Sequence, residues 1–116
     1  MDKTPQPLRG EVWLVSLDPT IGHEVKKTRP AVVVTADVYN EHNWVILVMP
    51  LTSRKTAEYD QVLILPPEGG VSNSSATLPD QLRAVDRKRL VKRLGSLSKE
   101  TLLRIDHSLK IVLGIA

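Results

Sequence analysis

Arg29 stands directly before Pro30 and a run of aliphatic residues, where it can hold an anion at a fixed point. The run 30–35 (PAVVVT) predicts a strand buried on both faces, and proline suits the first residue of such a strand because its missing N–H costs least there. Arginine stays protonated, and its planar guanidinium matches a phosphate. Because Lys26 and Lys27 lie just upstream, we predict an anion site at this strand end.

Three other polar segments could complete such a site. Gly22-His23-Glu24 precedes Arg29 in the same loop, Thr52-Ser53 follows the apolar run 44–50, and Asp80-Gln81 follows Pro79. Each segment alone has an ordinary explanation, since loop carboxylates and histidines are usually solvated and a Thr-Ser pair after a strand commonly bonds its own backbone. Taken singly, each segment is best explained in this ordinary way, and neither composition nor periodicity distinguishes it further.

The elements that must position these residues are predicted to be short strands followed by one helix. Alternating or continuous apolar patterns indicate the strands, and Ser98 and Gly114 suit the start and the end of the helix. This order suggests a small, partly open β-barrel closed by a C-terminal helix. We predict strands over 11–17, 30–35, 44–50, 61–65, 76–84 (broken at Pro79) and 90–97, helical turns within 37–43 and 86–89, and a helix over 99–113 whose apolar stripe is Leu102, Leu103, Ile105, Leu109, Val112 and Leu113.

The composition limits the class of protein. A chain of 116 residues is expected to form one domain, 9–116, after a disordered lead, 1–8. The absence of cysteine excludes disulfides and thiolate metal sites and is typical of a cytoplasmic protein. No apolar run reaches the ~20 residues of a membrane helix. The net charge of +3 permits a nucleic acid or an acidic partner, whereas two Trp, two Tyr and no Phe argue against a base-stacking platform.

Several catalytic motifs are absent from the chain. It contains no nucleotide-binding glycine loop, no H-E-x-x-H and no G-x-S-x-G. Its three histidines, His23, His42 and His107, fall in three different predicted elements, so no metal site is predicted.

The polar segments belong to a longer series of motifs. The series runs R-G-E-V-W at 9–13, T-R-P at 28–30, T-S at 52–53, D-Q at 80–81 and R-A-V-D at 83–86. Each motif is weak alone, but in this order they closely resemble the MazF/PemK/Kid family of bacterial toxins. The resemblance extends from about Arg9 to Ile115.

That resemblance implies a mainly β protein with a C-terminal helix, an SH3-like small barrel of the PemK/MazF/CcdB-like fold. It implies a homodimeric, metal-independent endoribonuclease toxin that cuts single-stranded mRNA at short sequences without a cofactor and so inhibits translation and growth. A cognate antitoxin would cover the RNA groove, and the toxin–antitoxin complex would bind DNA. The alternative within this fold is a non-catalytic toxin that binds a protein such as DNA gyrase, which the T-R-P and T-S motifs together argue against.

The resemblance assigns catalysis first to Arg29 and Thr52. His23 and Asp80 match positions that serve in the Kid-like branch of the family. That branch has an arginine two residues before the aspartate, where this chain has Leu78, so Arg29 would carry the charge alone. RNA contacts are expected from Lys26, Lys27, Thr28, Ser53, Arg54, Lys55 and Gln81.

The expected reaction is attack of the RNA 2′-OH on the neighbouring phosphorus, which leaves a 2′,3′-cyclic phosphate and a free 5′-OH. Arg29 would stabilise the phosphoryl charge and Thr52 would donate to a non-bridging oxygen. Arginine is a poor proton donor near neutrality. The general base is left among Glu24, Asp80 and His23, of which histidine is by residue type the one that titrates nearest to neutral pH. Binding through lysines to phosphates should weaken with salt.

Overall fold

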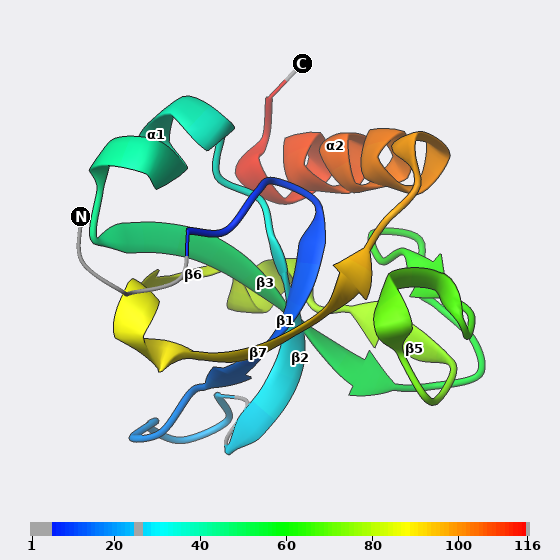
Figure 1. Ribbon diagram of the computed structural model, residues 1–116. Helices are drawn as coiled ribbons and strands as arrows, with labels where there is room; N and C mark the ends of the chain where they lie inside the picture. The colour runs from blue at the N-terminus through cyan, green and yellow to red at the C-terminus, as the bar shows by residue number, and fades with distance from the viewer. Residues whose placement is uncertain (1–5, 25–26, 116) are drawn as a thin grey trace.

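The protein folds as a curled antiparallel β-sheet with one long helix, which confirms the mainly β fold with a C-terminal helix (Figure 1). The computed structural model describes residues 6–24 and 27–115. The strands pair in the order β4–β5–β3–β2–β1–β7, and β6 also pairs with β3. The elements are β1 (Glu11–Ser16), β2 (Thr28–Val33), α1 (Asp37–His42), β3 (Val45–Ser53), β4 (Leu63–Ile64), η1 (Glu68–Gly70), β5 (Ser75–Thr77), η2 (Pro79–Gln81), β6 (Arg83–Asp86), η3 (Arg87–Arg89), β7 (Leu90–Ser96) and α2 (Lys99–Leu113).

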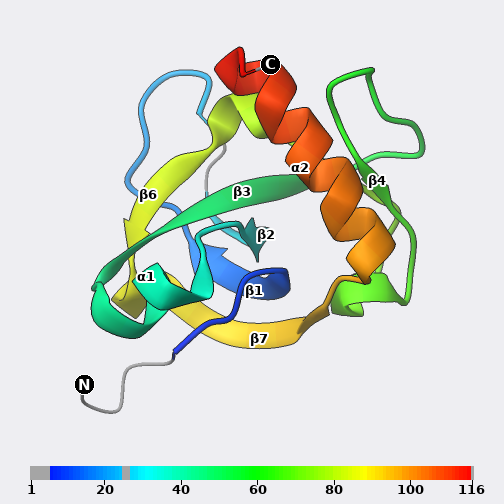
Figure 2. The same cartoon turned by 90° about the horizontal axis from the view of Figure 1, so that it is seen from above.

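Two apolar cores lie on opposite faces of the sheet. Successive residues of β2 alternate between them: Val32 packs in the same cluster as Ile105 of α2, whereas Ala31 packs in a cluster with Val48. Val85 of β6 joins the second cluster because it pairs with Ile46 of β3. We call these the outer core, under α2, and the inner core. Figure 2 shows the curled sheet from above. Register shifts in the β1–β7 pairing are the kind of irregularity that increases such curling.

The first half of β3 is less buried than its apolar sequence predicts. Val45 and Leu47 are 52% and 40% exposed, although residues 44–50 read as an uninterrupted core strand. The outer core extends along this strand only at Met49 and Leu51, where α2 covers the sheet. An apolar run therefore marked a strand correctly but did not show which part of it has a covering layer.

Arg9 and Gly10, which open the R-G-E-V-W motif, attach the sheet to α2. The Arg9 guanidinium donates to Asp106 Oδ1 at 2.5 Å and to the Val34 carbonyl at 2.9 Å. Gly10 has φ +89°, and a Cβ there would lie 2.7 Å from the side chain of Leu102. Only glycine allows both that backbone conformation and that close approach of the helix.

Glu11 in the same motif is a buried acceptor for three donors. Its carboxylate accepts from Leu8 N at 2.7 Å, from Trp13 Nε1 at 3.1 Å and from Arg93 Nε at 2.6 Å. A buried carboxylate needs such partners to offset its lost hydration. The motif that helped to indicate the family therefore has an architectural role rather than a catalytic one.

The ends of α2 are the predicted ones. Ser98 Oγ accepts from Thr101 N at 3.2 Å as the N-cap, and Gly114 ends the helix in the left-handed conformation. The short helical turns predicted within 37–43 and 86–89 are also present, as α1 and η3.

The buried face of α2 differs from the predicted apolar stripe. Leu103 and Leu113 are exposed, which corrects that part of the stripe. The buried positions are Thr101, Ile105 and Ser108, spaced four and three residues apart. Ser108 can be buried because its hydroxyl donates to the Asp60 carbonyl at 2.5 Å.

Glu68 provides a second cap for α2. Its Oε2 accepts from Ser98 N at 2.9 Å. Burial raises the pKa of this carboxyl, but hydrogen bonds from Thr101 and Ser98, together with nearby Arg104, outweigh that effect, so the pKa lies below its ordinary value of 4.5. Glu68 thus favours the folded state most in its charged form.

Glu68→Gln is expected to lower the free energy of unfolding by roughly 0.5–1 kcal/mol at pH 7, because it removes a charge from the start of α2. Since the folded pKa is lowered, the stabilisation is complete above pH 4.5 and is lost as the pH falls through the folded pKa. Urea unfolding at pH 7 and pH 3 measures this, with exposed Glu58→Gln as the control. A difference that persists unchanged at pH 3 would contradict the capping role.

Within the described residues, no helix has the length and apolar character needed to cross a membrane. Residues 1–5 of the predicted lead lie outside the described part of the chain.

Candidate functional site

Arg29 and Thr52 lie where β2 and β3 separate. The two strands pair through Ala31↔Pro50, and the same register continued by two residues places Arg29 opposite Thr52. At this point β3 pairs along its other edge, with Thr52 opposite Ala76 of β5. Figure 1 shows β2 and the end of β3 diverging here. Because alternate residues share a face of a strand, both side chains extend the face of the inner core.

Thr52-Ser53 belongs to β3 and not to a loop, which corrects the predicted strand end at Pro50. The apolar pattern stops at Leu51, but the backbone pairing with β5 continues to Ser53. The hydroxyl of Thr52 is therefore positioned by a strand ladder, a more rigid support than a turn.

A hollow of about 480 Å³ occupies the gap between the separating strands, and we call it the Arg29 hollow. Four of the five predicted catalytic residues line it, together with three predicted RNA contacts. Arg29 and Thr52 are half-buried in its wall, whereas the loop residues are exposed. Its lining is Gly22, His23, Glu24, Lys27, Arg29, Thr52, Arg54, Leu78 and Gln81.

Asp80 and Gln81 are positioned by a break in strand pairing. β5 and β6 both pair with β3, but β5 ends at Thr77 and β6 begins at Arg83, with η2 bulging out between them. The single broken strand predicted over 76–84 is thus two strands. Pro79 sits at the start of η2, where its missing N–H is tolerated.

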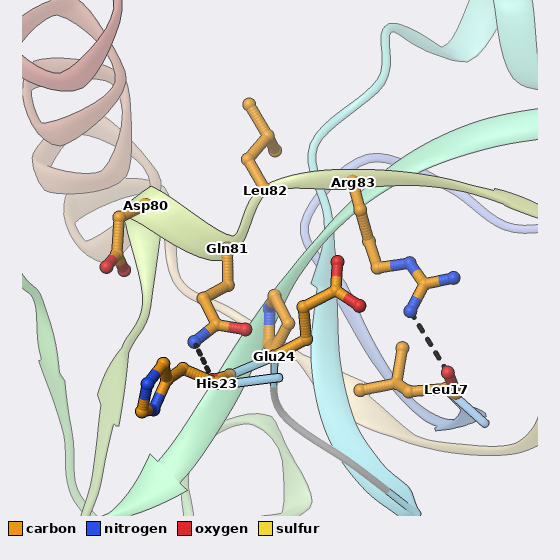
Figure 3. Close-up of a pocket in the computed structure, with 8 residues that line it drawn as sticks. Leu17, His23, Glu24, Asp80, Gln81, Leu82 and Arg83 are labelled. Carbon is orange, nitrogen blue, oxygen red and sulfur yellow. Dashed lines mark hydrogen bonds between the residues drawn. The ribbon is translucent and has the colours of Figure 1, made fainter. Parts of the chain in front are cut away.

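A second hollow, of about 320 Å³, lies beside the first, and we call it the Arg83 hollow (Figure 3). The two share His23, Glu24 and Gln81. Asp80 lines the second hollow and is not among the residues lining the first. The lining of the Arg83 hollow is Leu17, His23, Glu24, Pro50, Asp80, Gln81, Leu82 and Arg83.

Hydrogen bonds hold the β1–β2 loop over both hollows. Gln81 Nε2 donates to the His23 carbonyl at 3.3 Å, which ties the loop to η2 (Figure 3). Glu24 Oε1 accepts from Ile21 N at 2.6 Å, and Lys27 N donates to Asp18 Oδ1 at 3.0 Å. The loop therefore presents His23 and Glu24 at defined places.

Several predicted RNA contacts lie elsewhere. Ser53 and Lys55 line a third hollow with Asn73, and Arg54 borders both this hollow and the Arg29 hollow. Thr28 is exposed opposite Ser16 in β1. Lys26 lies outside the described residues.

Sequence reasoning missed Arg83 as a site residue. It opens β6, and one guanidinium nitrogen donates to the Leu17 carbonyl at 3.0 Å. Its place two residues after Gln81 was the available signal. Leu78, the residue that stands where the Kid-like pattern has an arginine, does line the Arg29 hollow, so this position supplies no second guanidinium.

The Arg29 hollow has the donors that an anionic oxygen requires. It combines the planar guanidinium of Arg29, the Thr52 hydroxyl and the ammonium group of Lys27 with one imidazole and one carboxylate. Among residues 6–24 and 27–115, no three His, Asp or Glu side chains gather as a metal-ligating group. Phosphate recognition with acid–base assistance is the chemistry this set can perform.

Known proteins share both the sequence and the fold. Residues 8–113 match the family model described as "PemK-like, MazF-like toxin of type II toxin-antitoxin system". Endoribonuclease MazF9 of Mycobacterium tuberculosis (strain ATCC 25618 / H37Rv) is 35% identical, over 92% of this chain and 96% of that protein.

Solved structures of other proteins share the fold of this chain. MazF from Deinococcus radiodurans superposes with a TM-score of 0.82 at 29% identity, covering 95% of this chain and 98% of that one. A MazE–MazF structure (Form-II) from the same organism gives a TM-score of 0.76 at 25% identity, with 97% and 99% covered. The predicted family is confirmed. The chain belongs to the PemK-like, MazF-like toxins of type II toxin-antitoxin systems.

Proposed function

We propose that this protein is an endoribonuclease toxin that cleaves single-stranded RNA by attack of a 2′-OH on the adjacent phosphorus. The observation that carries the proposal is the presence of Arg29 and Thr52 in one hollow with His23. Its 35% identity to a protein named an endoribonuclease supports the same activity. Because the nucleophile belongs to the RNA, the reaction needs no metal to generate it.

Arg29, Thr52 and His23 would have separate roles. The guanidinium of Arg29 binds the non-bridging oxygens and offsets the charge that grows on them, and the Thr52 hydroxyl donates to one of them. His23 accepts the 2′-OH proton as the O2′–P bond forms. The P–O5′ bond then breaks, and the leaving oxygen takes a proton from water in this open hollow, giving a 2′,3′-cyclic phosphate and a 5′-OH.

Geometry favours His23 over the two carboxylates as the base. Asp80 lines the neighbouring hollow and not that of Arg29. One oxygen of the Glu24 carboxylate, Oε1, is already bound to Ile21 N, which fixes its orientation. Imidazole is also the side chain type that best matches proton transfer near neutral pH.

The partners we propose are an antitoxin and a second copy of the chain. A related toxin has been solved as MazE–MazF, and a net charge of +3 suits an acidic segment that folds on binding. For the homodimer, the exposed apolar pair Val45 and Leu47 on β3 offers a surface that water solvates poorly.

The test is incubation of the purified protein with a mixed-sequence single-stranded RNA in excess chelator. We expect cleavage at a restricted set of sequences, with cyclic phosphate and 5′-OH ends identified by end-specific labelling. Folded protein that cuts no RNA would contradict the proposal and favour a non-catalytic toxin that binds a protein target. Cleavage that chelator abolishes would contradict the metal-free mechanism.

A further inference from the structure

The Arg83 hollow adjoins the proposed phosphate site but differs from it in charge. The Arg29 hollow is lined by three cationic side chains, Arg29, Lys27 and Arg54, and one carboxylate. The Arg83 hollow has one cation against two carboxylates, Glu24 and Asp80. Carboxylates repel a phosphate, so the second hollow suits a neutral group that carries N–H donors.

Part of the wall of the Arg83 hollow is apolar, since three of its eight lining residues, Leu17, Pro50 and Leu82, carry apolar side chains. Leu17 and Pro50 line it as buried residues, whereas the side chain of Leu82 is partly buried against the outer core. A volume of about 320 Å³ is at the small end of ligand pockets. Apolar faces with a few fixed polar groups are what an unstacked nucleobase requires.

The polar groups at one end of the Arg83 hollow are held in place, and they include both a hydrogen-bond acceptor and a donor. Figure 3 shows the Glu24 carboxylate between Gln81 and Arg83 in this view, with Asp80 at the opposite end. Ile21 N holds Glu24 Oε1 at 2.6 Å, and the Leu17 carbonyl holds one Arg83 nitrogen at 3.0 Å. A carboxylate can only accept and a guanidinium can only donate.

We infer that the Arg83 hollow is a guanine-binding subsite beside the scissile phosphate, an inference that rests on the proposed ribonuclease function. Guanine alone among the four RNA bases presents two neighbouring donors, N1–H and the N2 amino group, next to a carbonyl, O6. The two donors satisfy the Glu24 carboxylate, and O6 accepts from Arg83. Any other base leaves part of this set of donors and acceptors unpaired and is therefore bound less tightly.

This assignment gives Glu24 a new role. The sequence left Glu24 among the candidate bases, but its fixed carboxylate and its place beside Arg83 make it a reader of the base edge. It also assigns Arg83, for which sequence reasoning gave no role, to substrate selection.

The test maps every cut in a mixed-sequence RNA for the parent, for Glu24→Gln and for exposed Glu41→Gln as control. The parent and Glu41→Gln are expected to require guanine at one position next to the cut. Glu24→Gln should still cleave, with guanine preference there reduced roughly 10- to 100-fold, because one of its two acceptor oxygens becomes a donor.

Inosine, which lacks only the N2 amino group of guanine, sharpens the test. Replacing that guanine by inosine should slow the parent roughly 10-fold or more and leave the rate of Glu24→Gln nearly unchanged. An unchanged cleavage map for Glu24→Gln, or loss of all its cleavage, would overturn the inference while the ribonuclease activity of the parent stands. A parent that cuts no RNA would overturn the proposed function and the inference with it.

Discussion

Arg29→Ala is expected to lower kcat/KM for RNA cleavage by about 10²–10³, the usual cost of removing one preorganised donor from a transition state. Arg29 is half-buried and lines the same hollow as Thr52, and Leu78 leaves no second arginine at the neighbouring position. Most of the loss should appear in kcat, because the charge on the phosphoryl oxygens grows during the reaction.

Arg29→Lys separates charge from geometry. Lysine keeps the positive charge but cannot form the two parallel bonds of a guanidinium, so an intermediate rate is expected. Thr52→Val should lower kcat in the same direction, because valine keeps the branched shape and removes only the hydroxyl donor.

Lys27→Ala is the matched control for these variants, since Lys27 lines the same hollow from the loop. It should mainly raise KM and reduce the salt dependence of binding, as expected for a phosphate contact. Single-turnover kinetics at two salt concentrations measure all four variants. If Arg29→Ala and Lys27→Ala change only KM and do so equally, Arg29 is a binding residue and its proposed catalytic role is wrong.

The fold was predictable because its elements follow from local patterns. Apolar alternation indicated the strands, and Ser98 and Gly114 indicated the ends of α2. The pattern could not show which faces of the strands and of α2 are covered by other elements. Leu103 and Leu47 read as core residues, yet both are exposed, because burial depends on a layer that only the tertiary structure provides.

The candidate site was predictable only in part, for a similar reason. Arg29 precedes one apolar run and Thr52 follows another, but only the family resemblance marked them as catalytic. The β2–β3 pairing ends at Ala31↔Pro50, and continuing its register by two residues would place Arg29 opposite Thr52. Asp80 could not be separated from them by sequence, because its position depends on how η2 bulges between β5 and β6. Arg83 was missed because its place two residues after Gln81 did not show by itself that its side chain reaches the same hollow.

The burial of Arg87 is a further feature that the sequence does not show. Arg87 belongs to a basic run at 87–89, a composition typical of exposed residues, and yet it is fully buried. Its Nη1 donates to the Asn40 carbonyl at 3.2 Å, and its backbone N donates to the Trp44 carbonyl at 2.8 Å. The Asn40 carbonyl belongs to the last turn of α1, where the helix dipole favours a cation. The side chain therefore fastens α1 to the sheet.

Arg87→Met is expected to lower the free energy of unfolding by roughly 1–3 kcal/mol, the cost of leaving a buried acceptor without its hydrogen bond. Methionine fills similar space but leaves the buried carbonyl without a donor, and a backbone carbonyl cannot be replaced by an apolar group to compensate. Because small domains are stable by only about 5–15 kcal/mol, this loss should lower the midpoint of thermal unfolding measurably.

Urea unfolding at one fixed protein concentration measures this loss, since association would make stability depend on concentration. Lys88→Met, at the exposed neighbouring position, is the control and should change stability by less than about 0.5 kcal/mol. Arg87→Lys should fall between the two, because an ammonium group keeps the charge but reaches fewer acceptors. A loss below about 1 kcal/mol for Arg87→Met would mean that water or a neighbouring donor satisfies the end of α1, and that the guanidinium is not what holds this helix in place.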